Sequence, residues 1–314
     1  MMMKILFLDS DDLIERIAKR SLAKHELFFD ERSLNEDVAS EYSDVDILST
    51  FVGIKITKGI IDRMPKLKMI ATRSTGVDHI DVGYSKKRGV TVSNIPKYGA
   101  HPVAEHVFAL LLAGLRNIPE ASRSVKEGEW QTTGFEGKLI HGKTFGVLGT
   151  GFIGMNVCRI ARGFGANVIA YDIVKREKDA KEIGFDYVSL DELLKRSDII
   201  SVNLPLTEET RHLINEKTIK QMKDGVIIIN TGRGAIIDQN ALVRALKTKK
   251  VSFACLDVLE EEPPKKNEEI INFENVLITP HIAWNTDESK LFIAEKTVEN
   301  IIDFIKGRPT NVVS

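Results

Sequence analysis

The sequence predicts an α/β protein with two doubly wound parallel sheets, and two observations indicate this class. Short apolar runs alternate with helix-length amphipathic stretches along the chain, the pattern of βαβ units whose sheets are covered on both faces. The 314 residues are also enough for two domains of ordinary size, each with its own core. We therefore expect two parallel-sheet domains with a cleft between them.

The first domain is predicted from four apolar runs in the first third of the chain. Strands are expected at residues 4–8, 46–51, 69–73 and 90–93, and a helix near residues 13–24. The last periodic stretch, residues 287–305, follows the second sheet, so we expect it to pack on the first domain. This domain then spans residues 1–99 and 285–314, and the two chain crossings form a natural hinge.

The second domain is predicted to span residues 100–284 and to begin with a long apolar helix from Pro102 to Leu115. Its strands are expected at residues 145–148, 168–171, 199–203, 226–230, 253–257 and 276–279. A helix at residues 153–164 is expected to connect the first two of these strands. This order of strand, crossover helix and strand favours a parallel sheet.

A glycine-rich turn follows the first strand of the second domain, in the order Gly149, Gly151 and Gly154. Gly149 permits a tight turn, Gly151 lacks the Cβ that would block a pyrophosphate, and Gly154 lets the helix pack closely on the strand. The helix N-terminus then faces the phosphates with free N–H groups and the positive end of its dipole. The strand before and the helix after make this a dinucleotide-binding motif.

The acidic residue that this motif requires is Asp172, which closes the second strand 21 positions after Gly151. Its carboxylate can accept hydrogen bonds from both hydroxyls of the adenosine ribose, and it should repel a 2′-phosphate. The sequence therefore favours NAD as the cofactor. Lys175 and Arg176 follow closely and could pair with a 2′-phosphate, so NADP remains an alternative.

Composition excludes several other classes of protein. A net charge of −1 gives no global field that would attract nucleic acid or an anionic membrane. The longest apolar run, residues 107–115, is too short to span a bilayer, and the N-terminus has no signal-peptide cleavage site. Cys158 and Cys255 lie in apolar surroundings, which favours free core thiols and a cytoplasmic location. No His or Cys spacing indicates a metal site.

Three polar side chains follow successive strands of the second domain, where ligands of open parallel sheets bind. Arg233 follows residues 226–230, Glu262 ends the loop after residues 253–257, and His281 follows residues 276–279. Arg233 can hold a substrate carboxylate and polarise a neighbouring carbonyl, and His281 can pass a proton near neutral pH. Glu262 would bond the other ring nitrogen of His281. The set suits hydride exchange at a carbon that bears oxygen.

Each of these residues also has a structural interpretation. Arg233 between two glycines could cap a turn, Glu262 could be surface charge, and His281 after a proline could be a satisfied loop histidine. In the first domain, the loop from Ser74 through Thr75 and Gly76 to Val77 could bind a carboxylate through its backbone N–H groups, or it could be an ordinary turn. His106, on the apolar helix, is expected to be packed rather than catalytic.

The chain resembles the D-isomer-specific 2-hydroxyacid dehydrogenases over essentially its full length. Four segments carry the resemblance in order: Gly149-Thr-Gly-Phe-Ile-Gly154, Asn230-Thr-Gly-Arg-Gly234, Leu256-Asp-Val-Leu-Glu-Glu-Glu-Pro263 and Pro280-His-Ile-Ala283. The family implies a Rossmann cofactor domain, a flavodoxin-like substrate domain, and a homodimer paired through the cofactor domain with a contribution from the helix at Pro102. Its small-molecule partner would be a 2-keto or 2-hydroxy acid.

The resemblance also implies roles for individual residues. Arg233, Glu262 and His281 become the catalytic triad. Besides the three glycines, cofactor contacts are expected at Phe152, Ile153, Asp172, Pro205, Thr231, Gly232 and Asp257. Substrate contacts are expected at Ser74, Thr75, Gly76, Val77, Tyr98 and Trp284.

Within the family, the segments around Ser74 and Tyr98 are most similar to the D-lactate dehydrogenase branch. That branch often has a tyrosine after a Phe-Val pair, whereas here Phe51-Val52 is followed by Gly53. The missing ring would enlarge the pocket, so larger 2-keto acids compete with pyruvate as the expected substrate. The alternatives are reduction of glyoxylate or hydroxypyruvate, oxidation of phosphoglycerate, and a non-enzymatic NAD-sensing scaffold like the family's corepressor relatives. The length of the chain disfavours a large regulated phosphoglycerate enzyme.

Overall fold

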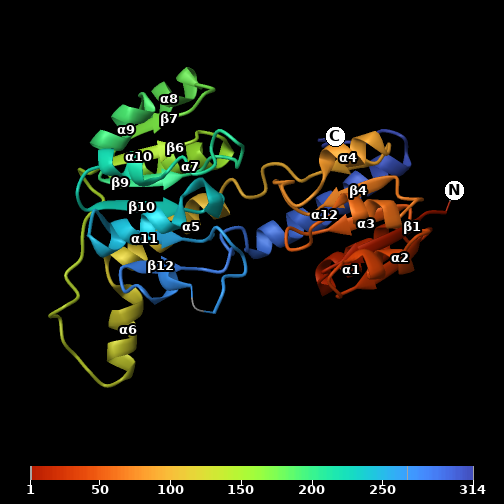
Figure 1. Ribbon diagram of the computed structural model, residues 1–314, viewed down its shortest axis with the longest axis horizontal. Helices are drawn as coiled ribbons and strands as arrows, with labels where there is room; N and C mark the ends of the chain where they lie inside the picture. Colours follow the sequence, from red (N-terminus) through yellow and green to blue (C-terminus); the bar gives the residue numbers. More distant parts are fainter. Residues whose placement is uncertain (1, 267, 314) are drawn as a thin grey trace. The chain divides into compact units, whose positions relative to one another are not determined.

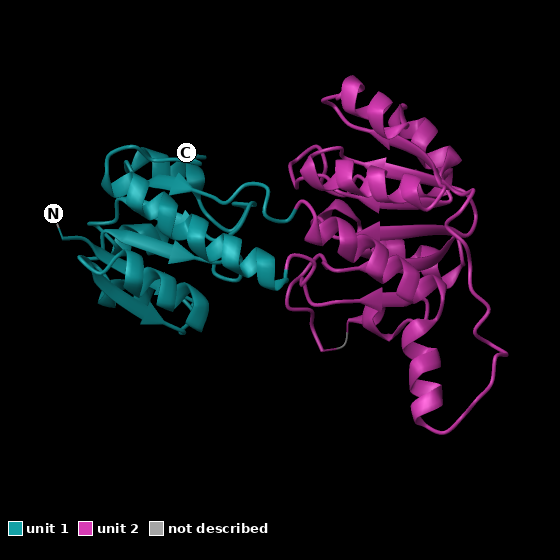
Figure 2. Ribbon diagram, turned by 180° about the vertical axis from the view of Figure 1, so that it is seen from behind, with its two compact units in different colours: residues 1–99, 285–314 teal, residues 100–284 magenta. Residues whose placement is uncertain are grey.

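The computed structural model describes residues 2–266 and 268–313. The chain forms two compact units, which we call unit 1 (Met1–Gly99 with Asn285–Ser314) and unit 2 (Ala100–Trp284), shown in teal and magenta in Figure 2. Both units are built on a parallel sheet, so the predicted α/β class is confirmed.

Unit 1 contains a five-stranded parallel sheet in the order β2-β1-β3-β4-β5. The strands are β1 (Lys4–Leu8), β2 (Glu26–Asp30), β3 (Ile47–Thr50), β4 (Met69–Thr72) and β5 (Thr91–Ser93). The helices are α1 (Asp12–Ser21), α2 (Glu36–Glu41), α3 (Lys58–Arg63), α4 (Val82–Lys87) and α12 (Asp287–Ile305). Figure 1 shows α12, in dark blue, lying along the sheet of the red and orange segment.

Two apolar clusters cover the two faces of this sheet. Ile5 and Phe7 of β1 face one cluster, which also holds Ile14 of α1 and Ala294 and Val298 of α12. The alternate residues of β1 face the other cluster, with side chains from α2, α3 and the loops. Because strand side chains alternate between faces, one strand serves both cores. The segment 287–305 is thus part of the core of unit 1.

Unit 2 contains a seven-stranded parallel sheet in the order β12-β11-β10-β9-β6-β7-β8. The strands are β6 (Thr144–Leu148), β7 (Asn167–Tyr171), β8 (Asp186–Tyr187), β9 (Ile199–Val202), β10 (Val226–Asn230), β11 (Val251–Leu256) and β12 (Val276–Ile278). The helices are α5 (Pro102–Leu115), α6 (Ile118–Lys126), α7 (Phe152–Gly163), α8 (Glu177–Ile183), α9 (Leu190–Arg196), α10 (Glu216–Gln221) and α11 (Gln239–Lys247). Short 3-10 helices occupy Gly234–Ile236 and Glu269–Asn272.

Helices cover both faces of this sheet as well. On one face, α5 and α7 bury Val107, Leu111 and Cys158 against the strands, and Cys255 of β11 lies in the same cluster. On the other face, α9, α10 and α11 pack on alternate strand residues such as Ile200 and Ile228. Both cysteines are buried free thiols, as predicted, and burial raises the pKa of each to about 12.

Two strands were not predicted. β2, whose side chains are all partly exposed, ends in charged residues and lies at one edge of its sheet, so its apolar run is short. β8 has only two residues and forms the edge of the other sheet. Within the described residues, no helix combines the length and apolar character that a membrane crossing needs.

Candidate functional site

The glycine turn of unit 2 has the geometry that its sequence predicts. Gly149, directly after β6, has a φ of +89°, a conformation that favours glycine. A Cβ on Gly154 would lie 1.9 Å from the carbonyl oxygen of Gly149, so only glycine lets the first turn of α7 approach the strand this closely. A Cβ on Gly151 would meet no atom within 4 Å, which leaves open space on the outer side of the turn.

Two observations indicate that these residues fit a dinucleotide. The N-cap of α7 is Gly151, and among the described residues no side chain caps this helix. The start of the helix therefore offers its dipole and backbone to an anion. At the end of β10, the hydroxyl of Thr231 is buried without a hydrogen-bond partner among the described residues. Leaving a buried hydroxyl without a hydrogen bond costs free energy, so a bound ligand that hydrogen-bonds to Thr231 would remove this cost.

Asp172 lies beside this turn, just after β7. Its Oδ2 accepts hydrogen bonds from the backbone N–H of Thr150 at 2.6 Å and from the Thr150 hydroxyl at 3.0 Å. Its Oδ1 accepts from the N–H of Val174 at 2.9 Å. Each carboxylate oxygen has two acceptor positions, so capacity remains for a ribose hydroxyl. Arg176 lies over the ring of Phe152, with 5.3 Å between its guanidinium carbon and the ring centre.

Arg233 lies in the loop after β10, which side chains and a close backbone contact hold in place. Asn230 accepts from the N–H of Gly232 at 3.0 Å and donates to the carbonyl of Arg233 at 2.9 Å. A Cβ on Gly234 would lie 1.9 Å from the carbonyl oxygen of Leu259, so the Arg233 loop packs directly against the loop that leads to Glu262.

Glu262 and His281 form the contact expected between them. Glu262 Oε2 lies 2.8 Å from His281 Nδ1, and Glu262 Oε1 accepts from the N–H of Leu259 at 3.0 Å. Burial alone would raise the pKa of Glu262, but the hydrogen bond and charge of His281, the Leu259 N–H and the charge of Arg233 together lower it. Arg233 thus acts electrostatically on the same carboxylate that contacts His281. Since Nδ1 of His281 faces Glu262, its other ring nitrogen, Nε2, is left outside this contact.

The backbone of His281 has a φ of +56°, and Asp257 holds it in this left-handed conformation. The carbonyl of Asp257 accepts from the N–H of His281 at 2.8 Å. Its side chain, which has no exposed surface, accepts from the N–H of Ile282 at 2.9 Å and that of Ala283 at 2.8 Å. These bonds fix the turn that presents the imidazole.

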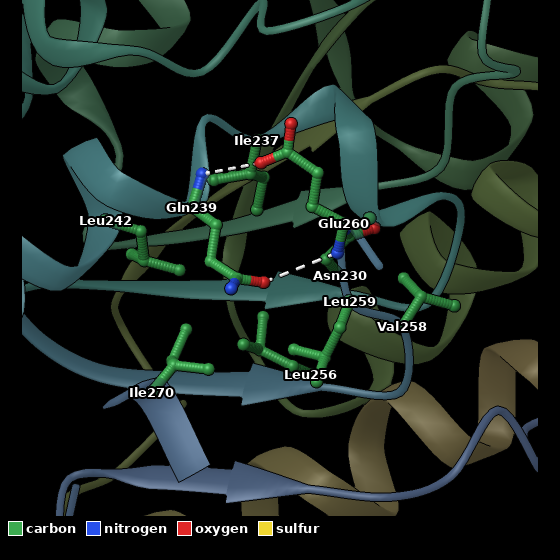
Figure 3. A pocket seen from close by; sticks show the side chains of 10 residues that line it. Asn230, Ile237, Gln239, Leu242, Leu256, Val258, Leu259, Glu260 and Ile270 are labelled. Carbon is green, nitrogen blue, oxygen red and sulfur yellow. Dashed lines mark hydrogen bonds between the residues drawn. The ribbon is translucent and has the colours of Figure 1, made fainter. Parts of the chain in front are cut away.

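The loop that carries Glu262 is also tied to the start of α11. The backbone N–H of Gln239 donates to Glu260 Oε2, and the side-chain oxygen of Gln239 accepts from the N–H of Glu260, both at 3.3 Å (Figure 3). The other oxygen of Glu260 lies 2.7 Å from His212 Nε2. A cavity of about 10 Å³ lies beneath this pair and has room for at most one water molecule.

A pocket of about 510 Å³ opens beside Glu262 and His281. Apolar side chains form most of its wall, namely Leu259, Pro263, Pro264, Ile271, Ile278 and Pro280. This volume lies in the range of small-molecule sites. Glu262 and His281 therefore lie at the wall of a pocket that unit 2 forms by itself.

In unit 1, the segment from Ser74 to Val77 follows β4 and is held by its own side chains. The Ser74 hydroxyl donates to the carbonyl of Gly76 at 2.7 Å, and the Thr75 hydroxyl donates to the carbonyl of Ile95 at 2.7 Å. Thr72 contacts the Ser74 hydroxyl at 2.7 Å and His79 Nε2 at 3.1 Å. Hydrogen bonds of its own side chains thus fix the conformation of this loop at the carboxyl end of the sheet.

The remaining predicted site residues differ in exposure and lie in both units. Phe152 and Pro205 are exposed in unit 2, and Ile153 is partly buried there. Tyr98 is half-buried in unit 1, whereas Trp284, at the end of unit 2, donates from its indole to the carbonyl of His281 at 3.1 Å. Within the residues the structure covers, no cluster of His, Cys, Asp and Glu has the arrangement of a metal site.

The sequence did not reveal two neighbours of this site, Thr279 and His106. The Thr279 hydroxyl donates to Asp257 at 2.6 Å and lies 3.1 Å from His106 Nε2. The polar interruption of the apolar helix at His106 was visible in the sequence, but its partner lies 173 residues further along the chain. Likewise, Asp257 was expected to contact the cofactor, and the structure shows its side chain bonded to the His281 turn.

Comparisons with known proteins agree with this site. Residues 108–283 match the model of the D-isomer specific 2-hydroxyacid dehydrogenase, NAD binding domain. A glyoxylate reductase of Thermococcus litoralis is 43% identical over 279 residues, 86% of this chain and 84% of that protein. A hydroxypyruvate reductase of Thermotoga maritima is 41% identical over 295 residues, 93% of this chain and 95% of that protein.

Solved structures lead to the same conclusion. The structure of D-lactate dehydrogenase from Aquifex aeolicus, complexed with NAD and lactic acid, superposes with a TM-score of 0.88 at 39% identity, over 97% of this chain and 96% of that chain. The family match, the relatives and the geometry of the glycine turn agree. The chain belongs to the D-isomer specific 2-hydroxyacid dehydrogenase family and is an NAD-dependent member of it.

Proposed function

We propose that this dehydrogenase reduces a short 2-keto acid to the D-2-hydroxy acid, with pyruvate or a somewhat larger acid as substrate. The observation that carries the proposal is the 2.8 Å contact between Glu262 and His281, next to the loop of Arg233. This arrangement supplies a proton donor whose orientation is fixed and a cation for the substrate anion.

The proposed role of Arg233 is to bind the substrate carboxylate and polarise the adjacent carbonyl, since its planar guanidinium offers paired donors. The proposed role of His281 is to donate a proton from Nε2 to the oxygen that becomes the hydroxyl, and to accept it in the reverse direction. Glu262 stabilises the protonated imidazole through Nδ1. The nicotinamide cofactor, when bound, would supply the hydride as NADH or accept it as NAD. Thr231 and the glycine turn would hold it.

The loop of Ser74, Thr75, Gly76 and Val77 in unit 1 is proposed to bind the same carboxylate through backbone N–H groups. The Ser74 hydroxyl supports this role because it fixes the Gly76 carbonyl, and with it the orientation of the following peptide. Tyr98 and Trp284 are proposed to shape the space for the substrate side chain.

Two observations bear on the size of that side chain. A Cβ on Gly53 would meet no atom within 4 Å, so the position that follows Phe51-Val52 has room for a larger group. The pocket beside Glu262 and His281 is walled mainly by hydrocarbon. Both support substrates with apolar side chains, whereas the two curated relatives favour glyoxylate and hydroxypyruvate as the second candidate pair.

The direct test is a panel of acids reduced with NADH and ranked by kcat/KM. The panel contains pyruvate, 2-ketobutyrate, 2-ketoisocaproate, phenylpyruvate, glyoxylate and hydroxypyruvate. We expect pyruvate or a larger acid to rank first. A higher rank for glyoxylate or hydroxypyruvate would replace the substrate proposal, and no loss of nicotinamide absorbance with any acid would favour an NAD-sensing scaffold.

A variant at Gly53 makes this ranking sharper. Gly53→Tyr fills the open space and should lower kcat/KM for phenylpyruvate relative to pyruvate, while Gly53→Ala should leave the ratio nearly unchanged. The same loss for every acid in Gly53→Tyr would show that this position does not select the side chain.

We further propose a homodimer that pairs through unit 2, with α5 contributing to the interface. Apolar side chains on and after α6 support it: Ile118, Val125, Trp130 and Leu139 are 56%, 50%, 89% and 67% exposed. Exposed apolar groups of this kind mark interaction surfaces. Light scattering coupled to size exclusion should give twice the mass of the 35.1 kDa chain, and Val125→Glu should reduce it. A monomer mass for the unmodified protein would contradict the proposal.

A further inference from the structure

His106 lies in the second turn of α5 and faces the turn that carries His281. Its Nε2 lies 3.1 Å from the Thr279 hydroxyl and 3.6 Å from Asp257 Oδ1, and its side chain is 20% exposed. Two neighbours on the helix, Ala104 and Val107, are fully buried, whereas Glu105 is exposed. The His106 ring is thus mostly buried and contacts a specific polar partner, Thr279.

The direction of the hydrogen bonds can be assigned. The Thr279 hydroxyl has one proton, and it donates that proton to Asp257 Oδ1 at 2.6 Å. Asp257 acts as an acceptor toward the backbone N–H groups of Ile282 and Ala283 as well. The oxygen of Thr279 must then accept from His106, so Nε2 of His106 carries a hydrogen. The bonds form one chain from His106 through Thr279 to Asp257.

This series of hydrogen bonds ends on Asp257, whose carboxylate holds the His281 turn. The two N–H groups that Asp257 accepts belong to the residues directly after His281, whose φ of +56° is unfavourable for a side chain with a Cβ. A strained conformation persists only where its surroundings determine it. Each bond that orients Asp257 therefore restricts the position of the imidazole.

We propose that His106 is a positioning residue for His281 and acts through Thr279 and Asp257. The proposal rests on the proposed function, in which His281 transfers the proton. His106 itself touches neither the glycine turn nor Glu262 in any described contact. Its part is to keep the imidazole of His281 at hydrogen-bond distance from Glu262.

The electrostatic surroundings keep His106 neutral in this role. Burial lowers the pKa of His106, and the charge of Asp257, the carboxylate facing it, opposes that effect only in part. Glu262 faces the ring of His281 at 2.8 Å, and the same Asp257 binds the backbone of the His281 turn.

The test compares two substitutions of His106 with a control on the same helix. His106→Gln keeps an N–H donor near the position of Nε2, and His106→Leu removes it at similar size. His101→Leu, at the exposed start of α5 where no side chain caps the helix, is the matched control. We expect His106→Leu to lower kcat about tenfold with little change in the Kd of NADH, because one hydrogen bond of the chain is lost. His106→Gln and the control should stay near the unmodified protein.

The pH profile separates positioning from packing. Keto-acid reduction needs the protonated form of His281, and a looser contact with Glu262 stabilises that form less. His106→Leu should therefore shift the midpoint of kcat/KM to lower pH by roughly half a unit. His106→Gln should restore the midpoint. An unchanged midpoint in His106→Leu, or equal losses in both variants, would overturn the proposal.

A second measurement does not depend on turnover. Histidine side-chain NMR, with the His281 signal assigned from a His281→Asn variant, reports its titration directly. A lower titration midpoint of His281 in His106→Leu, restored in His106→Gln, supports the proposal even if no keto acid is reduced. Failure of the whole acid panel in the unmodified protein would count against the proposed function alone.

Discussion

His281 is held through contacts of both its ring and its backbone. Its Nδ1 faces Glu262 at 2.8 Å, and its N–H and the two that follow bind Asp257. The imidazole is thereby held in one orientation before any substrate binds. Preorganisation of this kind contributes to catalysis because no reorganisation is needed during the reaction.

Replacing His281 by Ala should lower kcat by about 10²- to 10⁴-fold, the usual contribution of a positioned acid–base group. The Kd of NADH, measured by fluorescence titration, should change less than about twofold, because the glycine turn is unaffected. His141→Ala, in an exposed loop of the same unit, serves as the control. Comparable activity in His281→Ala and the unmodified protein would exclude this residue as the proton donor.

Glu262 gives a prediction about pH and stability. Its pKa is lower in the folded protein than in the unfolded chain, so its contribution to stability is present above the unfolded pKa and is lost as the pH falls through the folded pKa. Glu262→Gln should therefore show a smaller loss of Tm than the unmodified protein on acidification below about pH 4.5. Parallel Tm curves for the two proteins would contradict this linkage.

The Glu262→Gln variant should also change the pH dependence of activity. Without the carboxylate, the protonated form of His281 loses its anionic partner. We expect the midpoint of kcat/KM for reduction to move about one pH unit lower in Glu262→Gln. A pH–rate profile with a saturating concentration of NADH measures this shift.

At the scale of elements, the turn between β6 and α7 is the proposed cofactor site. Gly154→Ala would place a Cβ against the Gly149 carbonyl and should cost about 1–3 kcal/mol of stability together with NADH affinity. Gly163→Ala, at the other end of the same helix, meets no atom within 4 Å and should be neutral or stabilising by up to about 1 kcal/mol. Denaturant unfolding and NADH titration of both variants test the contrast; equal effects would mean that the close approach is unimportant.

The elements themselves were largely predictable because each buried strand of a parallel sheet leaves an apolar run in the sequence. The bounds of β1, α5 and α12 agree with the expected ranges, while the edge strands β2 and β8, which are partly exposed, left no such run. The contact of Glu262 with His281 was predictable for a related reason, since both follow neighbouring strands of one sheet.

The series of hydrogen bonds from His106 through Thr279 to Asp257 was not predictable in this way. It depends on how the side of α5 meets the end of β12, and no local pattern encodes that packing. The role of Asp257 in the His281 turn was missed for the same reason, because it requires the left-handed backbone at His281. The residue types were visible, but their distances come from tertiary structure.

At the scale of the whole molecule, the two units have separate cores. Among the residues that the structure describes, none of the four apolar clusters contains residues of both units, and unit 2 is one continuous segment. Residues 100–284 produced alone should therefore fold and bind NADH with an affinity close to that of the full chain, without reducing any keto acid. Circular dichroism, NADH fluorescence and the acid panel test this expectation. An unfolded fragment would show that unit 2 depends on unit 1.

The place of α12 in the core of unit 1 has a consequence for biosynthesis. Ala294, Val298 and Ile301 fill the same cluster as Ile5 and Phe7 of β1. On the ribosome, the sheet of unit 1 is translated before α12, so this apolar cluster, which α1 also covers in part, stays incomplete until residues 287–305 have followed unit 2. Until then, the part of the sheet that α12 covers is an apolar surface that chaperones would need to shield.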